Sequence, residues 1–256
     1  MNEQINKPVM LITGTSKGIG EYLANYYLSK GYFVIGCSRS ECTIKNENYT
    51  HFIVDITNEE EILNIFKSIR KDFKRLDFVI NNAVANPTDI SIALIPYNTI
   101  DYIFRVNVFA PILICREAVK IMSRNKFGRI INIGSMLTKH EIQGTSLYTT
   151  TKSAINTFTR VLSKEVYNFG ITANVVAPSA IETDLSENVR QDILIDVLSR
   201  NAINKYGNLS DVSNSIDFLL KPENQAITGQ IIYLGGAWWK LQLNQLLLVY
   251  GKQIAI

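Results

Sequence analysis

Residues 9–20, Val-Met-Leu-Ile-Thr-Gly-Thr-Ser-Lys-Gly-Ile-Gly, decide the fold of this chain. The apolar run Val9–Ile12 predicts a buried strand, and Glu21–Lys30 has helical spacing and ends at Gly31. The glycines between them permit a tight turn and let backbone N–H groups approach a pyrophosphate at the positive end of the helix. Since the turn joins a strand to a helix, we expect it to bind a nucleotide rather than serve only as a connection.

The rest of the chain repeats this alternation of short apolar runs and longer amphipathic stretches. Helical patterns lie at about 98–123 and 147–168, and Thr57 and Glu60 have the spacing of a capping box that opens another helix. Strands that are apolar on both faces and separated by helices predict a parallel sheet covered on both sides. Residues 1–256 are therefore expected to form one α/β Rossmann domain, with a doubly wound, seven-stranded parallel sheet and helices on both faces. The six further strands are predicted at Phe33–Cys37, His51–Val54, Phe78–Ile80, Arg129–Ile133, Thr172–Val176 and Ile231–Leu234.

Composition argues against several classes of protein. The 256 residues are 46% hydrophobic and 19% charged, which is ordinary for a globular domain. A net charge of +3 from scattered Lys and Arg does not favour nucleic acid or an anionic membrane as a partner. No run approaches the roughly 18–20 apolar residues that span a bilayer, and the N-terminus lacks the apolar stretch of a signal peptide. The cysteines form no C-x-x-C pair and the two histidines no ligand pattern, so we expect reduced thiols, no metal and a cytoplasmic location.

The end of the second strand favours NADP(H) over NAD(H). In this architecture the adenine ribose binds there, and an acidic residue would repel a 2′-phosphate. The chain instead has Arg39, with no carboxylate before Glu41. Arg39 can fork around a phosphate and Lys17 can add a second positive charge, although both could simply be solvated at the surface. NAD(H) stays open as the alternative.

Two more segments end at the same edge of the sheet. Asp55 follows the third strand and can either accept from the adenine amino group or cap the turn before Thr57. Asn82 and Ala83 follow the fourth strand, and their small side chains suit close contact with a cofactor. A purely structural turn is the alternative for this second segment.

Tyr148, Lys152 and Ser135 carry the predicted chemistry. Tyr148 and Lys152 are four residues apart at the start of a helical stretch, so both project from one face. Ser135 follows the strand Arg129–Ile133, so all three can converge. A nearby ammonium favours a phenolate, and we expect Lys152 to lower the pKa of Tyr148 well below its reference value near 10. Ser135 would stabilise charge on the oxygen of a small-molecule carbonyl or alcohol substrate, while Tyr148 acts as general acid or base.

These motifs together resemble the short-chain dehydrogenase/reductase family, in the subgroup that includes 3-oxoacyl-ACP reductase-like enzymes. The resemblance runs from about residue 8 to residue 237. Thr13–Gly20 matches the family pattern T-G-x-x-x-G-x-G, Asn81–Ala83 the start of N-N-A-G, and Tyr148–Lys152 the pattern Y-x-x-x-K, and Ser135 falls at the catalytic serine. The resemblance implies that Asn107 binds a water in a proton relay through the lysine. It also implies cofactor contacts at Gly14, Ser16, Lys17, Gly18, Ile19, Gly20, Arg39, Asp55, Ile56, Asn82, Ala83, Tyr148, Lys152, Pro178, Ile181 and Thr183.

The chain departs from the family pattern at Val84, Ser179 and Leu234, which replace two glycines and an Asp. Ser179 would cost cofactor affinity if its turn requires a positive φ. None of the three departures removes a proton-transfer group, so we expect an active enzyme.

Substrate choice is expected to depend on residues 184–206, as a mobile amphipathic lid or as an ordinary pair of surface helices. Met136, Leu137 and His140 are candidates for substrate contact, with a solvated loop position as the alternative for His140. The sequence has no clear anion-binding cluster near the predicted pocket, so an acyl-carrier thioester is not specifically indicated as the substrate. Sugar, steroid, acyl and polyketide-like carbonyl compounds all remain candidate substrates.

The resemblance also implies a homotetramer or homodimer that pairs the long helices at about 98–123 and 147–168. Beyond the family core, residues 238–256 form an apolar extension that we expect to pack against a neighbouring subunit. An intramolecular cover or an artefactual extension would be the alternatives.

Two other functions compete with a carbonyl reductase or alcohol dehydrogenase. A nucleotide-sugar epimerase or dehydratase shares Y-x-x-x-K, but such proteins are usually longer and space the Gly-rich turn differently. A non-catalytic dinucleotide-binding protein would not need Ser135, Tyr148 and Lys152 together.

Overall fold

Seven parallel strands form the centre of the computed structural model, which describes residues 7–86, 91–181 and 191–236. Within these ranges the strand order is β3-β2-β1-β4-β5-β6-β7, so the direction of winding reverses between β1 and β4. Ligands of open α/β sheets bind at such a reversal, outside the carboxyl ends of the strands. All the predicted strands and the doubly wound Rossmann fold are confirmed. The strands are β1 Val9–Thr13, β2 Phe33–Ser38, β3 Tyr49–Ile53, β4 Phe78–Asn81, β5 Gly128–Ile133, β6 Ile171–Ala177 and β7 Ile231–Tyr233.

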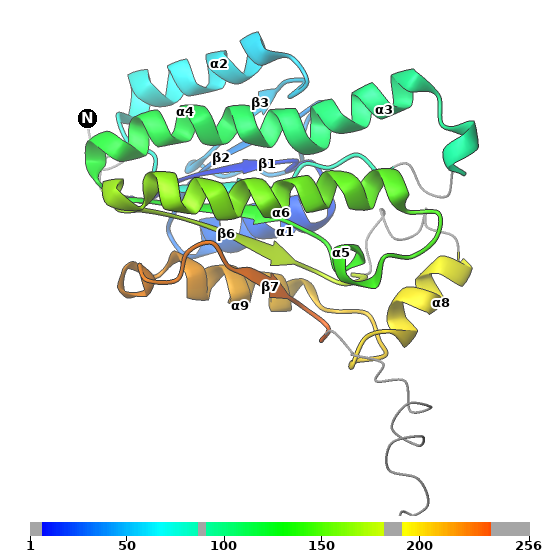
Figure 1. The fold of residues 1–256 in the computed structure, drawn as a ribbon. Coiled ribbons are helices and arrows are strands. Elements are labelled where there is room, and N and C mark those ends of the chain that lie inside the picture. Colours follow the sequence, from blue (N-terminus) through cyan, green and yellow to red (C-terminus); the bar gives the residue numbers. More distant parts are fainter. Residues whose placement is uncertain (1–6, 87–90, 182–190, 237–256) are drawn as a thin grey trace, which may run out of the picture.

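Helices cover both faces of the sheet, with α2, α4 and α6 on one side and α1 and α9 on the other (Figure 1). The shorter helices α3, α5 and α8 lie nearer the edge at which the strands end (Figure 1). The described helices are α1 Gly18–Ser29, α2 Glu59–Ser68, α3 Tyr97–Phe104, α4 Ala110–Asn125, α5 Leu137–His140, α6 Ser146–Val166, α8 Gln191–Ser199 and α9 Leu209–Leu220.

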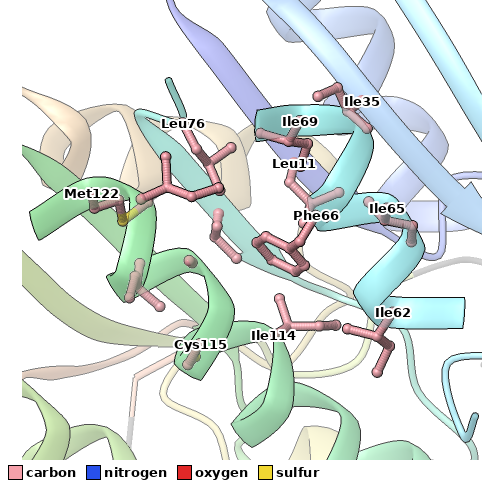
Figure 2. Packing of buried hydrophobic residues seen from close by; sticks show 14 of the residues in the cluster. Leu11, Ile35, Ile62, Ile65, Phe66, Ile69, Leu76, Ile114, Cys115 and Met122 are labelled. Carbon is pink, nitrogen blue, oxygen red and sulfur yellow. The ribbon is translucent and has the colours of Figure 1, made fainter. Parts of the chain in front are cut away.

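Alternation along the strands divides the core into two layers. Val9 and Leu11 of β1 pack with α2, α4 and α6, whereas Met10 and Ile12 pack with α1 and α9. Figure 2 shows the first layer, in which Phe66 of α2 is fully buried. Burying a side chain of this size stabilises a fold by roughly 1.5–3 kcal/mol. The two layers hold the carboxyl ends of the strands in fixed register.

Three boundaries differ from the sequence prediction. Helix α2 is capped by Asn58, whose side chain accepts from the backbone N–H of Glu60, so the capping box predicted from Thr57 is wrong. Strand β3 begins at Tyr49, earlier than predicted, because this edge strand is only partly buried and lacks an apolar run. The helix predicted at about 98–123 is divided into α3 and α4 by a π-helical segment, Arg105–Phe109.

No helix in the described part of the chain is long and apolar enough to cross a membrane. Among the same residues, no group of three or more His, Cys, Asp or Glu side chains is placed to hold a metal ion.

Candidate active site

The Gly-rich turn between β1 and α1 is shaped to receive a phosphate. Gly14 has a φ of +75° and Gly18 a φ of +61°, and L-residues with side chains rarely adopt this backbone conformation. A Cβ on Gly20 would lie 2.0 Å from the carbonyl oxygen of Gly14, so the turn closes on itself without room for a methyl group. Lys17, at the N-cap, gives α1 no side-chain cap. The N–H groups of the first helical turn therefore suit a pyrophosphate, which fits a dinucleotide.

The segment after β4 is fastened to this turn by Thr13. The Thr13 hydroxyl accepts from the backbone N–H groups of Asn82 and Ala83, each at 3.0 Å. The side chain of Asn82 donates back to the carbonyl oxygens of Thr13 and Gly14, at 2.9 and 3.2 Å. The amide of Asn82 therefore holds the Gly-rich turn, while Ala83 packs directly beside Gly14.

Asp55 and Ile56 occupy the turn after β3. A carboxylate oxygen of Asp55 accepts from the backbone N–H of Thr57 at 2.9 Å, which is the turn-capping role considered for it. Ile56 is 8% exposed and belongs to the core beside α2 and α4, so its side chain packs under the turn and not at the surface.

Arg39 lies at the end of β2, as the sequence predicted, and its side chain is exposed. Its guanidinium donates to the hydroxyl of Tyr102, in α3, at 2.7 Å. Nothing in the sequence indicated this contact, because the two residues are 63 positions apart. Tyr102 therefore holds the guanidinium at the carboxyl edge of the sheet without neutralising its charge.

Ser135, Tyr148 and Lys152 are brought together at the carboxyl end of β5. Their side chains come from the segment after β5 and from α6, and they are 8%, 8% and 4% exposed. The Ser135 hydroxyl accepts from the backbone N–H of Leu137 at 3.2 Å and acts to lower the pKa of Tyr148. The Lys152 ammonium lies 5.8 Å from the centre of the Tyr148 ring and donates to the carbonyl oxygen of Ile133 at 2.7 Å. These residues form a compact, water-poor group of a proton donor, a hydroxyl and a cation.

The expected lowering of the Tyr148 pKa is wrong for the protein alone. Burial raises the pKa of Tyr148 to about 12, and Ser135 only opposes this rise. Burial also lowers the pKa of Lys152 to about 8. The ammonium contacts a backbone carbonyl rather than the phenol oxygen, so desolvation dominates both groups.

Asn107 lies in the π-helical segment and forms hydrogen bonds to both the segment after β4 and helix α6. Its side chain exchanges two hydrogen bonds with the backbone of Ala85, both at 2.8 Å, and donates to the hydroxyl of Thr151 at 3.1 Å. Because both amide hydrogens are engaged in these bonds, the side chain could bind a relay water only through the second lone pair of its oxygen. Irregular helical turns of this kind often occur at functional sites.

The sequence model of the short chain dehydrogenase family matches residues 8–194. The chain belongs to this family. It is 30% identical over 234 residues to the 3-oxoacyl-[acyl-carrier-protein] reductase FabG of Haemophilus influenzae, covering 89% of this chain and 96% of that protein. The Rickettsia felis FabG is 32% identical over 232 residues, with 88% of this chain and 94% of the relative covered. The solved structure "ElxO with NADP Bound" is 28% identical, covers 89% of this chain and 97% of its own, and has a TM-score of 0.81.

As a short-chain dehydrogenase, the chain is an NAD(P)-dependent oxidoreductase, and its similarity to 3-oxoacyl-ACP reductases is confirmed. The segment that follows β6 connects the predicted nicotinamide side to the serine segment. The carbonyl oxygen of Pro178 accepts from the backbone N–H of Met136 at 2.9 Å, and Ile181 forms a parallel bridge with Gly207. Thr183 lies outside the described residues.

In this short-chain dehydrogenase, the two residues that stand where the family pattern has glycine are not strained. Neither Val84 nor Ser179 has a positive φ. The cost considered for Ser179 therefore does not arise. Its hydroxyl instead accepts from Asn201 at 2.6 Å, and the side-chain oxygen of Asn201 lies 2.9 Å from Nε2 of His140. His140 is 9% exposed, so the solvated position considered for it is wrong.

A cleft of about 850 Å³ opens beside the amino end of α6, next to α8. Its position makes it the candidate substrate site, since Ser146 in its wall is two residues before Tyr148. The apolar face of α8 packs Ile193 and Val197 against Ile142, so the described part of the expected lid is a single docked helix. The cleft is lined by Ser91, Ile92, Ile142, Gln143, Gly144, Ser146, Asp192, Ile193, Asp196 and Arg200.

Proposed function

We propose that this chain transfers a hydride between NADP(H) and the carbon of a carbonyl or secondary alcohol, with Tyr148 as the general acid or base. One observation carries the proposal: Ser135, Tyr148 and Lys152 are buried together at the carboxyl end of β5. A buried cation beside a buried phenol costs free energy, and the arrangement is difficult to explain as packing alone.

Each side chain has a definite task in this reaction. The nicotinamide, when bound, supplies the hydride in reduction and accepts it in oxidation. The Ser135 hydroxyl can donate to the substrate oxygen and stabilise the negative charge that develops there. Tyr148, protonated at neutral pH because burial raises its pKa to about 12, gives its proton to that oxygen in reduction.

Lys152 would lower the cost of the phenolate that remains. Its ammonium is held by the carbonyl of Ile133, and its other donors can bind the nicotinamide ribose. Asn107 positions this lysine indirectly, because it binds Thr151, the residue before Lys152. Asn107 is therefore proposed to hold the catalytic helix against the segment after β4.

The choice of NADP(H) is supported by charge at the end of β2. Arg39 is exposed and held there by Tyr102, and no acidic residue lies between the end of β2 and Glu41. The similar protein ElxO is described with NADP bound. Gly14, Ser16, Gly18, Ile19 and Gly20 would hold the pyrophosphate, Lys17 and Arg39 the 2′-phosphate, and NAD(H) remains the alternative cofactor.

Consumption of NADPH with a panel of ketones, aldehydes and oxoacyl thioesters tests the proposal. Tyr148→Phe should abolish turnover and still bind NADPH, because the substitution removes only the hydroxyl. Tyr97→Phe is the matched control, since Tyr97 is 77% exposed, and it should behave as the wild type. Binding of NADPH without turnover of any substrate would instead support a non-catalytic dinucleotide-binding protein.

We also propose a homodimer or homotetramer built on α4 and α6. Large apolar side chains on this side of the molecule are exposed, notably Phe109, Val161, Tyr167 and Phe169, which supports burial against another subunit. Residues 238–256, outside the described part, are proposed as an extension of the domain that packs on a neighbouring subunit. A truncation after Ala237 that leaves the oligomer and its melting temperature unchanged would refute that role.

A cytoplasmic location remains a prediction from the sequence. It is supported by Cys37, Cys42 and Cys115, which are all free thiols in the structure.

A further inference from the structure

A hydrogen-bonded cluster beneath the end of β2 contains His51, Tyr49, Thr15, Ser38 and Ser40. Nδ1 of His51 lies 2.8 Å from the Tyr49 hydroxyl, which donates to the Thr15 hydroxyl at 2.9 Å. Nε2 of His51 lies 3.1 Å from the Ser38 hydroxyl and 3.0 Å from the Ser40 carbonyl oxygen. The partly buried ring therefore joins the Gly-rich turn to the two residues that flank Arg39.

Gly36 makes this cluster possible. It pairs with His51 in the register of β2 and β3. A Cβ on Gly36 would lie 2.1 Å from the Tyr49 hydroxyl and 2.5 Å from the Thr15 hydroxyl. Any larger residue would displace the Tyr49 side chain, so the position of its hydroxyl beside Gly36 of β2 depends on this glycine.

The cluster can complete its hydrogen bonds in both protonation states of the ring. The Ser40 carbonyl can only accept, so Nε2 carries a hydrogen in both states. When the ring is neutral, Nδ1 accepts from Tyr49, and the hydrogen bond between Thr15 and Tyr49 reverses so that the Thr15 hydroxyl donates. When the ring is cationic, Nδ1 donates to Tyr49 and Tyr49 donates to Thr15. The ring can therefore take up a proton without losing a hydrogen bond in the cluster.

The surroundings of the ring leave its charge available to an anion. None of its hydrogen-bond partners among the described residues is a carboxylate. Burial raises the pKa of Tyr49 of β3, and that of Cys37 of β2 to about 12, so both are neutral. Cys42 donates to the Tyr49 hydroxyl at 3.5 Å.

The charged groups nearby also leave room for an anion. Glu21 of α1 accepts from the Thr43 hydroxyl, and Arg39 is held by Tyr102 of α3. Lys17 of the Gly-rich turn and Arg39 are both positive. An anion at this edge of the sheet would therefore lie near the positive charges of Lys17 and Arg39, and near His51, which contacts the two residues that flank Arg39.

We propose that His51 is a specificity-determining residue that strengthens discrimination of NADP(H) from NAD(H) as it becomes protonated. Its charge favours the 2′-phosphate through space, and its Nε2–H holds Ser38 and Ser40 on either side of Arg39. This inference rests on the proposed use of NADP(H) and adds a pH-dependent element to it, since histidine titrates in the physiological range.

The test measures the dissociation constants of NADPH and NADH for the untagged protein from about pH 5.5 to about pH 8.5, where histidine titrates. A phosphate monoester itself gains a proton near pH 6, so the wild type is compared with His51→Gln, which keeps a donor but cannot become charged. Between about pH 8 and pH 6, the preference for NADPH should rise in the wild type relative to the variant by on the order of threefold to tenfold, as for one partly screened charge. His140→Gln, which changes the other histidine, should follow the wild type.

Histidine NMR of the wild type provides a second readout that needs no folded His51→Gln. The chain has two histidines, so His140→Gln identifies the His51 signal. Because linkage is reciprocal, NADP⁺ should move the pH midpoint of that signal upward and NAD⁺ should not. The inference would be overturned if the preference for NADPH had the same pH dependence in the wild type and in His51→Gln. It would also be overturned if the pH midpoint of the His51 signal were the same with NADP⁺ and NAD⁺. Either outcome would leave the proposed function standing. Equal affinity for NADPH and NADH at every pH would overturn both this inference and the proposed preference for NADP(H).

Discussion

The side-chain ammonium of Lys152 donates a 2.7 Å hydrogen bond to the carbonyl oxygen of Ile133, the last residue of β5. A backbone dipole, and not a carboxylate, is therefore the neighbour that stabilises this buried cation. A single carbonyl compensates only part of the lost hydration, which is why burial lowers the pKa of Lys152 to about 8. The same water-poor site raises the pKa of Tyr148 to about 12, so in the protein alone this tyrosine keeps the proton that the proposed reduction would use.

Replacing Lys152 by Met should stabilise the protein without cofactor at neutral pH. The lysine pKa is lower in the folded state, so the unfolded state binds more protons between about pH 8 and pH 10.5. The stability of the wild type should therefore rise as the pH increases from about 8 to about 10. Lys152→Met should remove this rise and increase the free energy of unfolding at pH 7 by on the order of 1–3 kcal/mol. Urea denaturation at several pH values measures both effects, and a destabilised Lys152→Met protein at pH 7 would contradict the argument.

Gly20→Ala should disrupt the Gly-rich turn even though alanine is the better helix former. The new methyl group would lie 2.0 Å from the Gly14 carbonyl oxygen, so backbone must move. We expect a loss of more than about 2 kcal/mol of stability, or loss of nucleotide binding in a protein that still folds. Gly207→Ala is the matched control, because its nearest neighbour would be 3.8 Å away and its φ is not positive. Equal melting temperatures and nucleotide affinities for the two variants would show that the turn has room to relax.

The sequence predicted the central sheet well because its strands are buried on both faces. In β1 this burial produces the uninterrupted apolar run Val9–Ile12, and in β5 and β6 it leaves shorter apolar runs between polar residues. Strand β3 is an edge strand with polar Thr50 and His51, and its start was placed too late. The division of the long helix at Arg105–Phe109 has no local signal, since a π turn uses the same residue types as an α turn.

The candidate site was predicted less completely than the fold. Motif spacing located Ser135, Tyr148 and Lys152, but the direction of the Tyr148 pKa depends on burial, which spacing does not reveal. His51 was set aside because it lies in no ligand pattern. Its relation to Thr15 becomes visible only when the register of β2 and β3 is known.

Asn201→Ala should loosen the connection between α8 and the serine segment. The substitution leaves the Ser179 hydroxyl and Nε2 of His140 without their partner, and both groups lie in a largely buried region. Unpaired buried polar groups cost roughly 1–3 kcal/mol, so a lower melting temperature is expected. If the connection positions α8 over the cleft, KM should rise more than kcat falls. Ser199→Ala is the control, since within the described part of the chain the Ser199 hydroxyl donates to the Asp196 carbonyl on an exposed surface.

Arg39→Ala should weaken NADPH binding by about tenfold to a hundredfold and change NADH binding by less than about threefold, because only the former carries a 2′-phosphate that an arginine can fork around. Tyr102→Phe separates charge from position: it keeps the guanidinium and removes the hydroxyl that holds it at 2.7 Å. We expect an intermediate loss for NADPH alone, since the freed arginine must be ordered again on binding. Titration calorimetry of both nucleotides against both variants measures these effects. If Arg39→Ala weakened NADH and NADPH equally, the guanidinium would be supporting the fold of this edge, and the choice of cofactor would have to come from other residues.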